Sequence, residues 1–115
     1  MILLIKRQFL ENMSAYRYFE IMNYNILEKE SETKGSFYIE EGGETLAEMT
    51  YSKAGQERII VDHTEVNEVL RGKGAGVQLV AYAVGFVRKK GIKMLPLCPF
   101  AKATLQRHPE WKDVW

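Results

Sequence analysis

The sequence predicts an α+β fold (an α/β mixed sheet) in which an antiparallel strand meander leads into a parallel strand pair. Three observations support this prediction. The first half of the chain alternates apolar and polar residues between glycine-containing turns, as half-buried antiparallel strands do. Residues 58–97 then run from an apolar strand through a glycine-rich loop and a helix to a second apolar strand, and such a crossover joins parallel strands. Prolines at positions 99 and 109 frame a final helix.

Length and composition limit the classes of protein that fit. A chain of 115 residues with 46% hydrophobic residues makes one domain with a core of its own. The net charge of +1 gives no bulk field, which argues against a role at nucleic acid or at a membrane surface. The single cysteine rules out an internal disulfide, zinc-ligand spacing is absent and no metal is expected. The apolar start, residues 1–5, is too short for a signal or a membrane span, so we expect a cytoplasmic protein.

The first half of the chain is expected to form the antiparallel meander. Residues 1–21 carry no clear cap and are either an extension or an N-terminal helix, and the domain itself is expected over residues 22–115. Three strands alternating with turns are expected over residues 24–28, 36–40 and 45–51. The turns between and after them fall at residues 28–35, 41–44 and 53–56. In the third strand, the alternation puts on one buried face the side chains of Ala47, Met49 and Tyr51.

The second half is expected to form the parallel part of the sheet. Two strands and two helices are expected in turn, over residues 58–66, 77–90, 92–97 and 99–108. Gly91 follows three basic residues and is well suited to end the first of these helices. Pro96 cannot donate a ladder hydrogen bond, so the second strand must have one free edge.

A glycine-rich loop separates the first strand of this half from its helix. Glycines alternate there with basic residues in the sequence Arg71-Gly72-Lys73-Gly74-Ala75-Gly76. Free amide groups at a helix start, together with the helix dipole, form a seat for phosphate oxygens. A P-loop would need Ser or Thr where Gly74 stands, and a dinucleotide fingerprint would need a different glycine spacing. The loop therefore predicts another kind of phosphate site, and the alternative is a turn that binds nothing.

The pattern Arg71-x-x-Gly74-x-Gly76 resembles the acyl-CoA pyrophosphate loop of the GCN5-related N-acetyltransferases, Gln/Arg-x-x-Gly-x-Gly/Ala. With residues 62–66 (Asp-His-Thr-Glu-Val) and 96–100 (Pro-Leu-Cys-Pro-Phe), it is similar to a small single-domain, cysteine-containing subgroup of that family. The resemblance covers most of the chain. It implies a splayed parallel strand pair, with the pantetheine arm of acetyl-CoA or CoA lying against the backbone near Val66. It also implies transfer of the acetyl group to an unidentified aliphatic amine, for which a lysine on a macromolecule is one candidate.

Cys98 is the candidate nucleophile. It lies after a strand and before a helix, and helix N-termini favour the thiolate form of cysteine. The subgroup carries a cysteine beside the acetyl group, and an acetyl-cysteine intermediate is proposed for its members. No tyrosine lies between Pro99 and Pro109 to protonate the CoA thiolate, as many relatives do, and this departure favours a role for Cys98. The alternative is a cysteine that serves only packing.

His63 and Glu65 are candidate proton-transfer residues. They stand two apart on a strand and should share one face, with Thr64 and Val66 on the other. An imidazole exchanges protons near neutral pH, so His63 could be the base for the amine or for Cys98, with Glu65 as a weaker candidate. The cofactor contacts are expected from Val66 and from residues 71–76. The rival interpretation of the whole chain is a CoA-binding module without catalytic activity.

Overall fold

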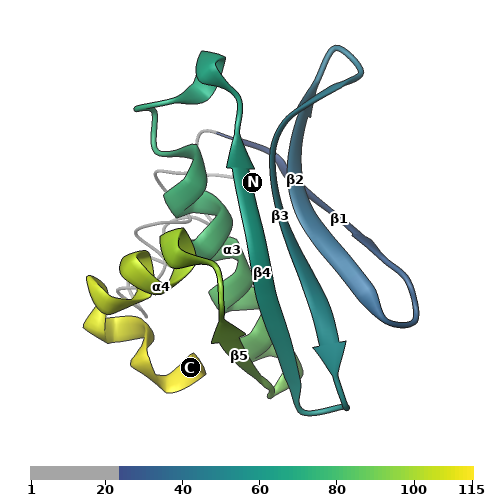
Figure 1. Ribbon diagram of the computed structural model, residues 1–115, viewed down its shortest axis with the longest axis vertical. Coiled ribbons are helices and arrows are strands. Elements are labelled where there is room, and N and C mark those ends of the chain that lie inside the picture. The colour runs from purple at the N-terminus through teal and green to yellow at the C-terminus, as the bar shows by residue number, and fades with distance from the viewer. Residues whose placement is uncertain (1–23) are drawn as a thin grey trace, which may run out of the picture.

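Over residues 24–115 of the computed structural model of the protein, five strands form one sheet in the order β1-β2-β3-β4-β5, and two helices cover one of its faces (Figure 1). The structure describes residues 24–115, so the expected boundary after residue 21 lies outside the described part. The strands are Ile26–Glu30 (β1), Lys34–Glu41 (β2), Glu44–Ala54 (β3), Arg58–Val66 (β4) and Lys93–Pro96 (β5). The helices are Ala75–Lys90 (α3) and Pro99–Gln106 (α4), with short 3-10 helices at Glu68–Leu70 (η1) and Pro109–Val114 (η2).

Strands β1 to β4 form the expected antiparallel meander. The turn between β2 and β3 is made by Gly42 and Gly43, which have φ angles of 60° and 80°, a conformation that glycine adopts without strain. Ala47, Met49 and Tyr51 of β3 are buried on one face, as the alternation predicts.

The bounds of four strands differ from the expectation. β1 begins and ends two residues later than expected, β2 begins two residues earlier and ends one later, and β5 is one residue shorter at each end. β3 begins one residue earlier and continues through part of the turn expected at residues 53–56. β3 extends because Lys53 is held by the neighbouring hairpin: its amide donates to Thr33 O (2.8 Å) and its ammonium to Ser31 O (2.9 Å). An ion pair with Glu30 adds to these contacts.

A β-bulge interrupts the pairing of β3 with β4. Thr50 pairs with His63 and Tyr51 pairs with Val61, so Asp62 is an extra residue on β4. Beyond the bulge, Met49 pairs with Thr64 and thus shares with it the face toward the helices. If residues 61–64 alternated strictly, with Asp62 paired and no bulge, His63 would be on that face instead.

The parallel pair of β4 and β5 is short. Four residue pairs join the strands, from Arg58↔Lys93 to Val61↔Pro96. The amides of Leu97 and Cys98 then both donate to Val61 O, at 2.9 and 3.0 Å, and the chain turns into α4. β4 runs on to Val66, and within residues 24–115 no strand lies beside it on that edge. β5 is an edge strand, which explains how the sheet tolerates Pro96.

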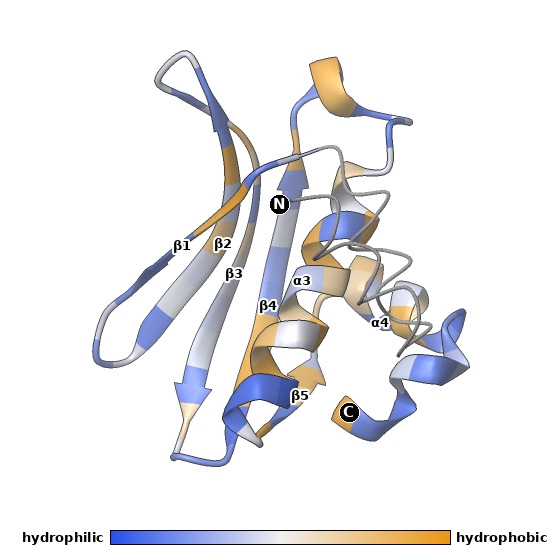
Figure 2. Ribbon diagram, turned by 180° about the vertical axis from the view of Figure 1, so that it is seen from behind, coloured by the Kyte–Doolittle hydropathy of each residue, from blue (hydrophilic) through white to orange (hydrophobic). Residues whose placement is uncertain are grey.

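The core lies between the sheet and the two helices, and the apolar side of α3 faces the sheet (Figure 2). α3 ends where expected, at Gly91 with φ 67°. The region between sheet and helix holds an aromatic cluster of Phe37, Tyr51, Tyr82 and Phe86. Burial raises the pKa of Tyr51 and of Tyr82 to about 12.

The end of the chain forms the 3-10 helix η2. Trp111 is buried there, whereas Trp115 is 38% exposed. Arg88 of α3 clamps η2 through two hydrogen bonds to the carboxylate of Asp113, at 2.7 and 3.0 Å, and the guanidinium lowers the pKa of that carboxyl. In the described part of the chain, no helix has the length and apolar character that crossing a membrane would require.

Candidate active site

Cys98 lies at the fork where β4 and β5 part. It is the N-cap residue of α4, and its carbonyl accepts the hydrogen bond from Lys102 N that begins the helix. Its amide donates to Val61 O on β4, so the backbone is fixed to both elements. The residue is only 5% exposed, and its Sγ lies 3.4 Å from Thr64 Oγ1. The sulfur therefore faces the stretch of β4 that has an open edge.

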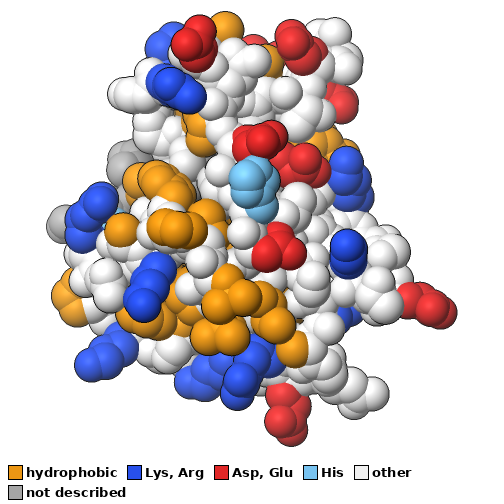
Figure 3. Space-filling model, viewed as in Figure 1, with side chains coloured by type: hydrophobic (Ala, Val, Ile, Leu, Met, Phe, Trp, Pro, Cys, Tyr) orange, Lys and Arg blue, Asp and Glu red, His pale blue; other side chains and the backbone are white. Residues whose placement is uncertain are grey.

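His63 and Glu65 lie on the opposite face of β4 from Thr64, as the alternation predicts. His63 Nε2 is 3.1 Å from Glu65 Oε1, and the two side chains are 63% and 77% exposed. The structure thus brings His63 and Glu65 together on the outer face, while it brings Cys98 together with Thr64 on the inner one. Figure 3 shows the outer face, where acidic side chains gather around a histidine.

The glycine-rich loop connects β4 to α3 through η1. Asn67 positions its start, because its amide donates to Leu46 O and its Oδ1 accepts from Val69 N, at 2.8 and 2.9 Å. The amides of Arg71 and Lys73 are already used within turns, since they donate to Glu68 O and Leu70 O. Two of the amides expected to bind phosphate are therefore not available for it.

Four other amides of the loop have no backbone hydrogen-bond acceptor within the described residues, namely those of Gly72, Gly74, Ala75 and Gly76. Gly72 and Gly74 have φ angles of 75° and 77°, which only glycine adopts easily. Gly74 caps α3 without a side-chain hydrogen bond, and the first turn holds no acidic residue. The positive end of the helix dipole is therefore available to an anion, beside the exposed Arg71 side chain.

Gly76 has a different reason to be glycine. A Cβ there would lie 2.6 Å from Cζ of Phe100, so the missing side chain makes room for the Phe100 ring. Phe100 lies in the first turn of α4 and is 40% exposed. This contact ties the start of α4, where Cys98 lies, to the start of α3, where the loop ends.

A hollow of about 510 Å³ joins several of the predicted site residues. Thr64, Glu65, Val66 and Arg71 line it, together with residues at the start of β3. It therefore lies where the start of β3 meets the end of β4, beside Arg71 of the basic loop. Cys98 does not line it but contacts Thr64, which does.

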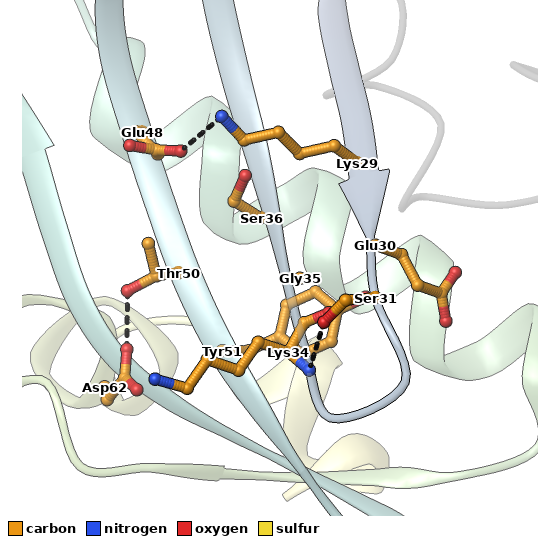
Figure 4. A pocket seen from close by; sticks show the side chains of 10 residues that line it. All are labelled: Lys29, Glu30, Ser31, Lys34, Gly35, Ser36, Glu48, Thr50, Tyr51 and Asp62. Carbon is orange, nitrogen blue, oxygen red and sulfur yellow. Dashed lines mark hydrogen bonds and ion pairs between the residues drawn. The ribbon is translucent and has the colours of Figure 1, made fainter.

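A second hollow, of about 470 Å³, lies on the outer face of β1 to β4 (Figure 4). An ion pair between Lys29 and Glu48 and a 2.5 Å hydrogen bond from Thr50 to Asp62 border it. Ser36 Oγ is buried in its wall, and we find no partner for it among the described residues. Because Ser36 pairs with Thr50 and Thr50 pairs with His63, the hollow adjoins the histidine.

Sequence reasoning missed the contributions of Thr64 and Phe100. The alternation places Thr64 on the face opposite His63, but nothing in it assigns that face to Cys98. The signal for Phe100 is its position two residues after Cys98 in an apolar, exposed first turn, which does not reveal a contact with Gly76.

Comparisons with known proteins agree on one family. The model of the family described as GCN5-related N-acetyl-transferase matches residues 36–114. Among solved structures, the chain is similar to a GCN5-like protein from Staphylococcus aureus, with 35% identity, a TM-score of 0.61 and coverage of 82% of this chain and 89% of that chain. A search of curated proteins finds no match.

More distant structures share the fold. A ribosomal-protein-alanine N-acetyltransferase from Brucella melitensis biovar Abortus 2308 is 14% identical, with a TM-score of 0.56 over 68% of this chain and 62% of that chain. An aminoglycoside N-acetyltransferase in complex with CoA is 13% identical, with a TM-score of 0.53 over 76% of this chain and 89% of that chain.

Proposed function

This chain belongs to the GCN5-related N-acetyltransferase family, and from that premise we propose that it transfers acetyl from acetyl-CoA to an aliphatic amine through Cys98. The observation that carries the proposal is the place of the sulfur. Cys98 Sγ lies at the fork of β4 and β5, against Thr64, which lines the hollow leading to the basic loop. A thioester lying in this fork would be within reach of the sulfur.

The loop and the open edge of β4 supply the parts of a CoA site. The pyrophosphate would accept hydrogen bonds from the amides of Gly72, Gly74, Ala75 and Gly76, with Arg71 and Lys73 adding positive charge. The pantetheine arm would lie beside residues 62–66, whose backbone has no neighbouring strand on that edge, and end near Val66 and Thr64. The complex of CoA with a distant relative of the same fold supports this assignment.

The reaction we propose has two steps. In the first, the Cys98 thiolate attacks the acetyl carbonyl carbon, a new S–C bond forms, the old S–C bond breaks and CoA leaves as a thiolate. In the second, a neutral amine attacks acetyl-Cys98, an N–C bond forms, the S–C bond of acetyl-Cys98 breaks, and the released cysteine sulfur takes up the proton that the nitrogen loses. Each step exchanges one acyl bond for another and needs no oxidant or metal.

His63 would serve the second step from the outer face. An ammonium must lose its proton before it can attack, and the imidazole of His63, paired with Glu65, is placed to take that proton from an amine arriving there. The outer face also carries the hollow of Figure 4, which supports an approach from this side. The acceptor would thus enter opposite the sulfur and meet the acetyl group across the open edge of β4.

Intact-mass spectrometry after incubation with acetyl-CoA tests the proposal. We expect one added acetyl group on the wild type and none on Cys98→Ala, and we expect the acetyl group to disappear when an alkyl diamine is added. His63→Gln should still accept the acetyl group but should pass it to the amine more slowly. If Cys98→Ala still acetylates amines at the wild-type rate, the transfer is direct and the cysteine step is wrong. If CoA binds but a broad panel of amines and lysine peptides stays unmodified, the protein is a binding module.

A further inference from the structure

We propose that Thr64 is the positioning residue for Cys98: its hydroxyl orients the sulfur and donates a hydrogen bond to it in the thiolate form. The inference rests on the proposed function, in which Cys98 acts as the nucleophile. It assigns a role to a residue that neither the loop pattern nor the catalytic candidates included.

The contact joins two residues that are far apart in sequence and fixed by different elements. Sγ and Oγ1 are 3.4 Å apart, within the range of a hydrogen bond that involves sulfur. A threonine hydroxyl has one donor and can also accept, so it can receive the S–H of the thiol and, with its O–H turned, donate to the thiolate. A hydrogen bond to a charged group is stronger than one to a neutral group, so the Thr64 hydroxyl would hold the sulfur more firmly when it donates to the thiolate than when it accepts from the thiol.

The backbone holds both partners in place. Thr64 lies opposite the buried Met49 in the β3–β4 ladder, and its β-branched side chain has few rotamers. Cys98 is fixed by the hydrogen bond of its amide to Val61 O and by its place as the N-cap of α4. The geometry therefore belongs to the fold and does not depend on a mobile loop.

The bulge at Asp62 explains why threonine, and not histidine, has this place. The extra residue turns Thr64 to the inner face with Cys98 and leaves His63 on the outer face with Glu65. A thiolate–imidazole pair, the usual device for activating cysteine, is thus not formed between His63 and Cys98, and a neutral hydroxyl stands in its place. The two neighbouring residues thus have different roles: Thr64 hydrogen-bonds to the sulfur of Cys98, and His63 takes the proton from the amine.

The rate of alkylation of Cys98 by iodoacetamide tests the inference. The chain has one cysteine, so the rate reports that sulfur alone. Thr64→Val keeps the branched shape and removes the hydroxyl, and we expect it to slow alkylation at pH 7 roughly tenfold, the size of one hydrogen bond to a charged group. At pH 10, where thiols are largely ionised, the variant should react at least as fast as the wild type. Thr64→Ser restores the donor and should restore most of the rate at pH 7.

Thr33→Val is the matched control. Thr33 is exposed in the turn between β1 and β2, and β2 is two strands away from β4 in the sheet, so the same substitution there should leave alkylation unchanged. The inference is overturned if Thr64→Val reacts like the wild type at pH 7, or if it is slower by the same factor at both pH values, since that result indicates altered access. A loss at pH 7 caused by His63→Gln instead of Thr64→Val would also overturn it.

This experiment separates the two proposals. Alkylation needs no acetyl-CoA, so an effect of Thr64→Val on alkylation without any acetylation of Cys98 would reject the proposed function and keep the Thr64–Cys98 coupling. Acetylation of Cys98 at equal rates in the wild type and in Thr64→Val, with equal alkylation, would keep the function and reject the role of Thr64.

Discussion

Gly35→Ala tests how tightly the sheet packs beneath α3. Gly35 lies at the start of β2, opposite Tyr51 of β3. A Cβ built on Gly35 would lie 2.3 Å from both Cζ and Oη of Tyr51, far inside normal contact. Tyr51 is only 2% exposed, and its ring is confined by those of Phe37 and Phe86, at centroid distances of 5.2 and 5.8 Å. The ring therefore cannot swing away, and the strand or the aromatic cluster must shift.

Two opposing effects set the change in the free energy of unfolding that Gly35→Ala should cause. Overpacking a filled core costs about 1–3 kcal/mol. Replacing glycine by alanine also restricts the unfolded chain, which stabilises the fold by about 0.4–1 kcal/mol. We therefore expect Gly35→Ala to lower the free energy of unfolding by about 1–2 kcal/mol.

Gly85→Ala is the matched control, because it makes the same chemical change at an open site. Gly85 is an exposed residue inside α3, and among residues 24–115 no atom outside the neighbouring helix backbone lies within 4 Å of the position that a Cβ would take there. Alanine is favoured over glycine in helices, so this variant should be more stable than the wild type by about 0.5–1 kcal/mol.

Urea unfolding followed by circular dichroism measures both variants. The two alanine substitutions should shift the midpoint in opposite directions. Tyr51→Leu removes the atoms that clash, so in that background Gly35→Ala should lower the free energy of unfolding much less than it does in the wild type. The packing argument fails if Gly35→Ala is as stable as the wild type, or if its cost is unchanged beside Leu at position 51.

Two further predictions concern alkaline stability and the cofactor loop. The pKa values of Tyr51 and Tyr82 are raised from 10.0 to about 12, chiefly by burial, so the folded state favours the neutral phenols. Their contribution to the free energy of unfolding is therefore complete below pH 10 and should be lost as the pH rises from 10 to 12. Urea midpoints measured across that range should fall, and less steeply in Tyr82→Phe; a flat profile would contradict this. Arg71→Ala should weaken CoA binding in calorimetry roughly tenfold or more, the size of a charged hydrogen bond to phosphate, whereas Lys89→Ala, which removes a charge at the far end of α3, should not.

The parts of the fold that depend on local pattern were predictable. The bounds of β4 matched because an apolar run is flanked by turns, and α3 ended at Gly91 because that residue takes up a left-handed conformation. The parallel arrangement of β4 and β5 followed from the helix between them. These features need information from only a few neighbouring residues.

The parts that depend on distant contacts were not predictable. The bulge at Asp62 depends on how β4 pairs with β3, and no pattern among its neighbours in sequence predicts it. The same holds for Phe100 on Gly76 and for the 3-10 helix that Arg88 clamps. At the candidate site, the alternation assigns the faces of His63 and Thr64 correctly, but which of them meets Cys98 is decided by how β4, β5 and α4 meet.

The extra residue in β4 has an evolutionary consequence. Deleting Asp62 would restore regular pairing through Val61, His63 and Thr64, and it would leave the imidazole on the acceptor side and the hydroxyl beside the sulfur. At this position, β4 can therefore lose a residue without exchanging the side chains on its two faces. Lineages that differ by a single-codon deletion here would therefore be expected to keep the same mechanism.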